Sequence, residues 1–184
     1  PRRGGASFGR VKILGICGSL QAASGNLSLL QRAATLLPEG ASLTLYEGLG
    51  HLPHFNPDLA AGEPPAPVNA LREAIAASDA LLIASPEYGH SLPGALKNAV
   101  DSIGSEWFGK TVGFVSYGAD GGVRAVEQWR QIVANFQMLD VRAQVSLSLF
   151  AEFGTDGFTP LDRRTGELKT LLDQLVGLTA KVNA

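Results

Sequence analysis

The sequence predicts an α/β domain in which a parallel sheet is covered by helices on both faces. Short apolar runs alternate along the chain with longer segments whose apolar residues recur at helical spacing. One run, ALLIAS at residues 80–85, lacks the alternation of a half-exposed strand and is typical of a parallel strand buried on both faces. Such a strand–helix alternation favours right-handed crossovers within one open sheet.

The elements follow from this pattern in order. Strands are expected at residues 11–17, 42–46, 80–85, 111–117 and 141–149, and helices at residues 26–37, 68–78, 93–103, 123–138 and 160–182. The tripeptide PEG at 38–40 and the dipeptide SD at 78–79 mark the first two helix-to-strand junctions. Ligands of open α/β sheets bind at the carboxyl ends of strands, so the segments after the first, third and fourth strands are the places to search.

The composition is that of an ordinary globular chain. Its 184 residues, 45% of them hydrophobic and 17% charged, suit a single domain over residues 11–184, preceded by a basic arm at 1–10 that we expect to be flexible. A net charge of −2 and a pI near 5.9 favour neither nucleic acid nor an anionic membrane as a partner.

Cysteine usage and hydropathy narrow the cellular setting. Cys17 is the sole cysteine, which excludes a disulfide within the chain and a Cys-rich zinc site, and no metal site is assigned. No apolar segment approaches the roughly 20 residues that cross a bilayer. No signal-peptide core precedes the first strand. The sequence therefore predicts a cytoplasmic protein.

Residues 104–111, GSEWFGKT, match the G-x-x-x-x-G-K-[ST] pattern of nucleotide triphosphatases. That motif requires a strand before it and a helix after it, whereas here a predicted helix precedes and a strand follows. Glu106, Trp107 and Phe108 also place bulk and negative charge where a phosphate would lie. We interpret the match as coincidence, and expect a turn in which Trp107 and Phe108 cover the sheet edge.

Residues 17–26, CGSLQAASGN, have the strand-to-helix setting that a phosphate site needs. Gly18 allows a sharp turn, and Ser19, Ser24 and Asn26 can donate hydrogen bonds to phosphate oxygens. The amides that open the helix add donors and the positive end of its dipole. Ordinary capping explains one such residue rather than three, and G-x-G-x-x-G is absent. The loop predicts a site for a phosphate monoester.

Two further loops should reach the same edge. The segment SPEYGHSLPGALKNAVD, residues 85–101, is stiffened by two prolines, so Glu87 and Tyr88 should project from a rigid shelf. The segment SYGADGG, residues 116–122, supplies a hydroxyl and glycines that let the backbone approach a flat ring. The three loops indicate one phosphate-binding end and one ring-binding end.

These residues resemble the NADPH-dependent FMN reductase family over residues 11–150. The family loop G-S-x-R-x-x-S-x-N is matched at Gly18, Ser19, Ser24 and Asn26, with Gln21 at the arginine position. The family motif S-P-E-Y-N-x-S-x-P-G-x-L-K-N-A-x-D-W is matched at Ser85, Pro86, Glu87, Tyr88, Ser91, Pro93, Gly94, Leu96, Lys97, Asn98, Ala99 and Asp101. The segment HLPHFNPDL, residues 51–59, looks like the loop after the family's second strand.

The resemblance implies a flavodoxin-like fold, a three-layer sandwich whose five-stranded parallel sheet has the order 2-1-3-4-5. It also implies bound FMN, with the phosphate at the first loop and the ring against residues 86–88 and 116–118. The cofactor-binding residues implied are Ser19, Gln21, Ser24, Gly25, Asn26, Pro86, Glu87, Tyr88, Gly89, Ser116, Tyr117 and Gly118. A homodimer or homotetramer whose interface borders the flavin is implied as well.

The sequence departs from the family pattern at three positions. Gln21 replaces the arginine and removes a charge-assisted phosphate contact worth about 1.5–3 kcal/mol, unless Arg32, Arg124 or an arginine of a partner subunit substitutes. Gly89 replaces an asparagine, and Ser102 replaces a tryptophan.

We expect an oxidoreductase that passes a hydride from NADPH or NADH through FMN to a quinone, azo, nitro, metal-oxyanion or flavin acceptor. No catalytic side chain is assigned, because His51, His54 and His90 form no nucleophile–base pattern. Tyr88 should pack against the ring or the nicotinamide, and Glu87 either shapes its loop or takes part in the reaction. Two alternatives remain: a flavodoxin-like electron carrier, and a fold member whose FMN binding is weakened by Gln21.

Overall fold

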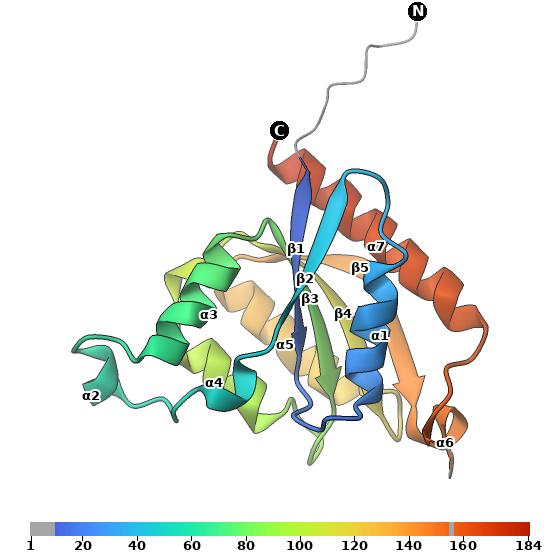
Figure 1. Ribbon diagram of the computed structural model, residues 1–184, viewed down its shortest axis with the longest axis horizontal. Helices are drawn as coiled ribbons and strands as arrows, with labels where there is room; N and C mark the ends of the chain where they lie inside the picture. The colour runs from blue at the N-terminus through green and yellow to red at the C-terminus, as the bar shows by residue number, and fades with distance from the viewer. Residues whose placement is uncertain (1–9, 155–156) are drawn as a thin grey trace, which may run out of the picture.

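The sheet of the protein has the predicted order. The computed structural model describes residues 10–154 and 157–184, so of the expected arm at residues 1–10 all but Arg10 lies outside the described residues. Five strands, β1 (Val11–Cys17), β2 (Ala41–Tyr46), β3 (Ala80–Pro86), β4 (Thr111–Gly118) and β5 (Leu139–Ser148), form one sheet in the order β2-β1-β3-β4-β5. Each neighbouring pair is parallel, which confirms the fold class (Figure 1).

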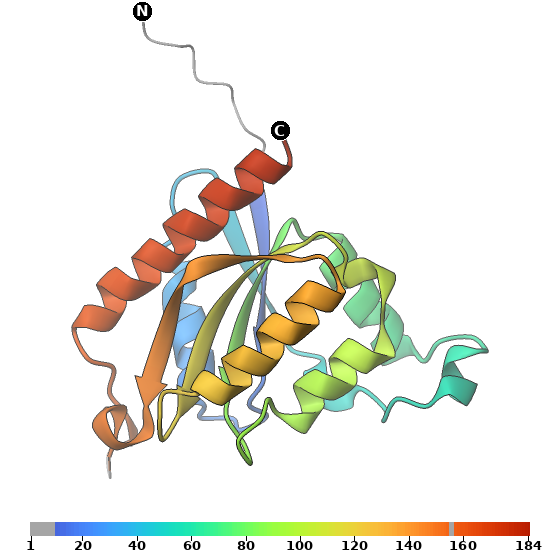
Figure 2. The same cartoon turned by 180° about the vertical axis from the view of Figure 1, so that it is seen from behind.

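Helices cover both faces of this sheet. α1 (Gly25–Ala34) and α7 (Arg163–Val182) lie on one face, while α3 (Ala66–Ala76), α4 (Gly94–Ser102) and α5 (Val123–Asn135) lie on the other, with α4 and α5 on the near side of Figure 2. β3 is buried along its whole length between the two helical layers, as the unbroken apolar run predicts. β2 forms one edge of the sheet and is only half-buried.

Several short elements were not predicted, because segments of two to four residues carry no periodic pattern. They are η1 (Leu49–His51), α2 (Pro57–Ala60), η2 (Ser105–Trp107), α6 (Leu149–Glu152) and the antiparallel pair β6 (Phe153–Gly154) and β7 (Gly157–Phe158).

Some predicted boundaries were wrong by a few residues. The helix predicted at 123–138 stops at Asn135, since Gln137 has a φ of 50° that a right-handed helix does not accept. β5 then starts at Leu139, two residues earlier than predicted. α1 ends at Ala34 and α7 starts at Arg163, so both helices are three residues shorter than predicted at those ends.

Residues 104–111, GSEWFGKT, form a structural turn between α4 and β4. Lys110 Nζ donates a hydrogen bond to the carbonyl of Ser78, just beyond α3. The expectation for the two aromatic residues was wrong for Trp107, which is 1% exposed and packs against Trp129 in the core instead of covering the sheet edge. Phe108 is 52% exposed. The segment therefore supports the packing of α3 and α5 and does not present a phosphate loop.

Candidate functional site

Three loops meet at the carboxyl ends of the strands, the lower edge of the sheet in Figure 1. The hydroxyl of Tyr88, after β3, lies 3.5 Å from Oγ of Ser19, after β1. The amide of Glu87 donates to the carbonyl of Tyr117 on β4 at 2.7 Å. The loops after the first, third and fourth strands are thus in contact, as the parallel topology predicts.

The start of α1 carries polar groups without protein partners. Ser24 occupies the N-cap position and is buried, yet its side chain makes no capping hydrogen bond. Asn26 is 2% exposed and its Oδ1 has no hydrogen-bond partner among the described residues. The first backbone hydrogen bond of the helix runs from the amide of Ser28 to Ser24, so the amides of residues 25–27 have no acceptor in the described part of the chain.

The backbone amides fit a phosphate, and the side chain of Asn26 would donate to one through Nδ2, since its Oδ1 only accepts. Unpartnered amides and the positive end of the helix dipole attract an anion, and the first turn of α1 contains no acidic residue to oppose one. The loop is also held firmly against the core, because a Cβ on Gly18 would lie 2.3 Å from Cδ1 of Leu96 on α4. We call this region, residues 18–26, the phosphate end of the site.

In the described part of the chain, the side chains of Arg32 and Arg124 form no hydrogen bond or ion pair with the phosphate end. Gln21 itself is exposed, and its amide donates to Oγ of Ser19 at 3.3 Å. Arg32 lies in the last turn of α1, about 10 Å along the helix axis from Gly25 at 1.5 Å per residue. Arg124 is paired with acidic residues elsewhere. Among the described residues, the donors that line the phosphate end are neutral.

A pocket of ≈ 360 Å³ opens on the β2 side of the first loop. Ser19 and Gln21 line it together with Glu47 and several leucines, and no other predicted site residue does. The pocket therefore includes part of the phosphate end and Leu27 of α1, but not Ser24, Gly25 or Asn26.

Cys17 closes β1 directly below the phosphate end. Its Sγ donates to the carbonyl of Ser19 at 3.5 Å and contacts Oγ of Ser24 at 3.9 Å. Burial raises the pKa of this thiol, and the two hydrogen bonds only partly oppose that effect. Cys17 is half-buried and neutral at physiological pH, as expected of a small packed residue.

The turn after β3 presents Tyr88 at the rim. Tyr88 and Ser91 exchange two backbone hydrogen bonds, both 3.1 Å, around Gly89 and His90. The φ angles of Gly89 and His90 are 57° and 60°, the left-handed pair that a tight type I′ turn requires. Tyr88 is 52% exposed on this rigid turn, and His90 is exposed as well. Glycine in place of the family asparagine suits the turn, since both residues accept a left-handed backbone.

Glu87 has a structural task. Its side chain is 7% exposed, and its two carboxylate oxygens accept from the backbone amide of Arg124 at 3.0 Å and from Nη1 of the same residue at 2.9 Å. Nη1 of Arg124 also pairs with Asp120 at 3.0 Å. Both Glu87 oxygens are thus committed, which favours the loop-shaping role over a role in the reaction. We call residues 86–91, together with Arg124 and the loop after β4, the ring end.

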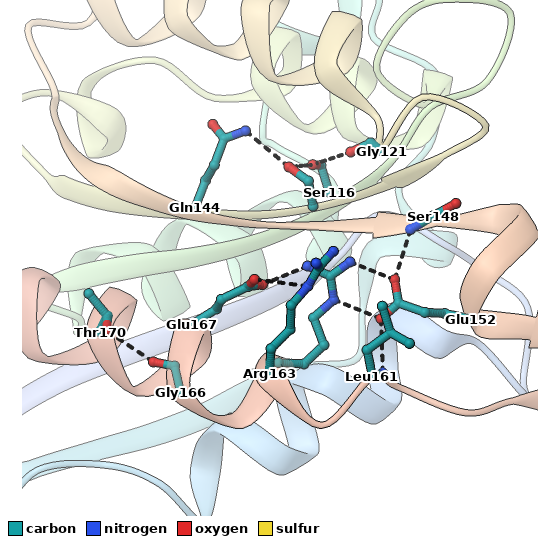
Figure 3. Close-up of polar contacts among 12 residues, drawn as sticks. Ser116, Gly121, Gln144, Ser148, Glu152, Leu161, Arg163, Gly166, Glu167 and Thr170 are labelled. Carbon is teal, nitrogen blue, oxygen red and sulfur yellow. Dashed lines mark hydrogen bonds and ion pairs between the residues drawn. The ribbon is translucent and has the colours of Figure 1, made fainter.

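The loop after β4 is folded by Ser116. The hydroxyl of this buried residue donates to the carbonyl of Gly121 at 2.6 Å (Figure 3). Gly122 has a φ of 73°, and a Cβ there would lie 2.7 Å from the amide nitrogen of Tyr117, so the loop needs glycine. Ser116 was predicted to touch the cofactor, but its hydroxyl is already satisfied within the protein. Gly118 is buried against Gly122 and Glu87.

Tyr117 points away from the ring end. Its ring packs against Phe153 with the centroids 4.6 Å apart, on the α1 and α7 side of the sheet. Burial, and to a smaller extent the neighbouring Tyr88 hydroxyl, raises the pKa of Tyr117. Sequence reasoning missed Phe153, because only the loops after the first, third and fourth strands were considered. The available signal was that a fifth parallel strand must end at the same edge.

The comparison with known families decides the assignment. The sequence matches the family described as NADPH-dependent FMN reductase over residues 11–152. The chain belongs to this family. An NADPH-dependent FMN reductase is an oxidoreductase whose cofactors are FMN and NAD(P)H, and the resemblance carried by the two sequence motifs is thereby confirmed.

Individual relatives of the chain agree with the family assignment. A plant relative, the NAD(P)H:quinone oxidoreductase of Solanum tuberosum, is 32% identical over 184 aligned residues that cover 94% of each chain. An NAD(P)H-dependent FMN reductase of Pseudomonas aeruginosa is 50% identical over 92 residues, 50% of this chain and 49% of that protein, so this match spans about half of the relative. The solved structure of a flavoenzyme NAD(P)H:(acceptor) oxidoreductase from Paracoccus denitrificans superposes with a TM-score of 0.79 at 26% identity, covering 93% of this chain and 98% of that one.

Two further findings concern membrane spans and metal sites in the described part of the chain. Throughout residues 10–154 and 157–184, no helix is long and apolar enough to cross a membrane. No three His, Cys, Asp or Glu side chains within these ranges gather closely enough to hold a metal ion.

Proposed function

We propose that this chain binds FMN across the phosphate end and the ring end, oxidises NAD(P)H and reduces a small-molecule acceptor, with a quinone as the first candidate. The observation that carries the proposal is the start of α1, beside the rigid turn that presents Tyr88: Ser24 makes no capping hydrogen bond, and the first-turn amides have no acceptor among the described residues. The name of the Solanum tuberosum relative supports a quinone acceptor.

The residues present divide the work of holding FMN. Ser24, Asn26 and the amides of residues 25–27 would hold the phosphate, with Ser19 and Gln21 as outer donors. The ring would lie against residues 86–89 and the backbone of 117–118, with Tyr88 covering its edge or the nicotinamide. When bound, FMN supplies hydride acceptance from NAD(P)H and electron transfer to the acceptor. The three histidines of the chain are exposed, and no side chain is assigned a proton-transfer role.

The test is a flavin titration followed by a turnover assay on the purified chain. We expect the protein to take up one equivalent of FMN with quenching of flavin fluorescence, and then to oxidise NADPH when a benzoquinone is supplied. Uptake of FMN without NADPH oxidation by any acceptor would favour an electron carrier. A colourless protein that binds no FMN would overturn the proposal and favour a fold member that has lost the cofactor through Gln21.

The remaining features are proposed from the family resemblance and the composition. The chain forms a homodimer or homotetramer whose interface borders the flavin, which light scattering of the flavin-loaded protein would measure. A net charge of −2 supports small molecules, not nucleic acid or a membrane surface, as partners. A single half-buried thiol suits the reducing cytoplasm, and cell fractionation would test that location.

A further inference from the structure

The segment after β5 brings aromatic rings to the start of α1. Phe153 and Phe158 pair across the β6–β7 hairpin with ring centroids 4.9 Å apart. Phe153 also packs on Tyr117 at the end of β4, with centroids 4.6 Å apart. We call these three residues the aromatic wall. Phe153 and Phe158 lie beyond the two family motifs and beyond the loops from which the phosphate and ring ends are built, whereas Tyr117 belongs to β4.

The aromatic wall touches α1 at its first residue. A Cβ placed on Gly25 would lie 2.3 Å from Cζ of Phe153 and 3.1 Å from Cδ2 of Phe158. The Phe153 ring cannot swing aside freely to admit a side chain, because its neighbours in the wall pack against it. Only glycine lets the ring rest on the helix backbone here. Gly25 stands between Ser24 and Asn26, so the position of this ring fixes where the two phosphate donors lie.

The residue before Phe153 is anchored on all sides. The carboxylate of Glu152 accepts from Nε and Nη2 of Arg164, both at 2.7 Å. It also accepts from the amides of Ser148 at 2.9 Å and Leu161 at 3.2 Å (Figure 3). The side chains of Glu152 and Arg164 are 0% and 6% exposed. Burial acts to raise the pKa of Glu152, but the hydrogen bonds from Arg164, Ser148 and Leu161 outweigh it and hold that pKa below its ordinary value.

This anchoring fixes geometry more than it adds stability. A buried ion pair is often no more stabilising than well-packed apolar side chains of the same volume, since both charges lose their hydration. A bidentate arginine–carboxylate pair does, however, define one relative orientation of its two backbone segments. Here it ties the end of β5 to the start of α7 and so sets where the hairpin begins.

We propose that Phe153, held by the Glu152–Arg164 pair, is a positioning residue for FMN: its contact with Gly25 sets the first turn of α1 and thereby the preference for FMN over riboflavin. The proposal rests on the proposed function, which places the FMN phosphate at this turn. An arginine at position 21 would add affinity for the phosphate by charge attraction. The aromatic wall adds part of that affinity by holding neutral donors in place.

The test compares the dissociation constants of FMN and riboflavin, which differ by the phosphate alone. Flavin-free protein is titrated with each ligand, and binding is followed by quenching of flavin fluorescence. In Gly25→Ala and in Phe153→Ala we expect the dissociation constant of FMN to rise about tenfold and that of riboflavin by less than about twofold. In the double variant the two effects should not multiply, because the added methyl group enters the space that the ring has left.

Phe150→Ala is the matched control. Phe150 is also an aromatic residue of the segment after β5, but it is 79% exposed, so its removal should leave both dissociation constants unchanged. Phe153→Leu keeps apolar bulk and is the substitute background should Phe153→Ala unfold, which the melting temperature of each variant reports.

The outcomes are distinct. Three results would each overturn the positioning role. They are equal weakening of FMN and riboflavin binding, unchanged FMN binding in a folded variant, and effects of Gly25→Ala and Phe153→Ala on FMN binding that multiply in the double variant. Absence of FMN binding in the unmodified chain would instead overturn the proposed function, and the positioning role with it.

Discussion

The phosphate end and the ring end of the site differ in whether their polar groups are hydrogen-bonded within the protein. At the phosphate end, the first-turn amides of α1 have no acceptor among the described residues. At the ring end, both oxygens of Glu87 and the hydroxyl of Ser116 are fully engaged within the protein.

The difference shows which part of the ligand each end recognises. Leaving a buried polar atom without a hydrogen bond costs about 1–3 kcal/mol, so unpartnered groups persist where a ligand completes them. Polar groups that are hydrogen-bonded within the protein fix the shape of the loops. A fixed loop shape is enough to bind a flat ring that carries little charge. Polar substitutions should therefore alter phosphate recognition at one end and general rigidity at the other.

Asn26→Ala should have the largest effect on the cofactor. It removes a buried donor to a charged ligand, worth about 1.5–3 kcal/mol, so the dissociation constant of FMN should rise about 10–100-fold. Riboflavin, which lacks the phosphate, should bind almost as before. Parallel fluorescence titrations check this. A loss shared equally by both flavins would show that Asn26 supports the fold and not the phosphate.

Gln21→Arg should change FMN affinity in the opposite direction to Asn26→Ala. A guanidinium at this exposed position should tighten FMN binding about tenfold at low salt, and the gain should shrink at about 1 M salt because exposed charges are screened. Glu47 lines the pocket beside Gln21 and could capture the new arginine. The double variant Gln21→Arg/Glu47→Gln is therefore the control, and no gain in either variant would contradict the prediction.

Glu87→Gln tests the ring end. It removes the charge that holds Arg124 at the start of α5, so the melting temperature should fall. FMN and riboflavin should weaken by the same factor, roughly threefold or less, because the loop and not a ligand contact is altered. Asp120→Asn removes the more exposed partner of the same arginine and should have a smaller effect. A selective loss of FMN would break the distinction between the two ends.

Lys110→Met should leave flavin binding unchanged, although Lys110 belongs to the segment that matches a phosphate-loop pattern. Burial lowers the pKa of this lysine, with Asp79 partly opposing, and its ammonium binds the carbonyl of Ser78. Loss of that hydrogen bond should lower the free energy of unfolding by about 1 kcal/mol, as measured by urea denaturation. A change in FMN affinity, or ATP binding by the unmodified chain, would contradict the structural role.

The sequence predicted the features that follow from repeated patterns. Alternating apolar runs fixed the parallel sheet, and the unbroken run at 80–85 predicted the full burial of β3. The convergence of Ser19, Tyr88 and Tyr117 also followed, because parallel strands deliver their loops to one edge.

The rest depends on contacts that have no local signature. The β6–β7 hairpin has two residues per strand, too few for a period, and its contact with Gly25 joins segments more than 120 residues apart. The burial of Trp107 likewise depends on Trp129 and Phe136, which are distant in sequence. From the sequence alone, the hydroxyl of Ser116 is a candidate ligand contact. The folded loop shows that it donates a hydrogen bond to the carbonyl of Gly121 instead.

Cys17 gives the protein a built-in reporter. It is the single sulfhydryl of the chain, and its Sγ contacts both Ser19 and Ser24 beneath the phosphate end. Any thiol-directed label therefore reacts at one position, which is half-buried and lines the pocket beside the first loop. The labelling rate should fall as FMN fills the site, so a simple thiol assay would count occupied molecules without light absorption or turnover.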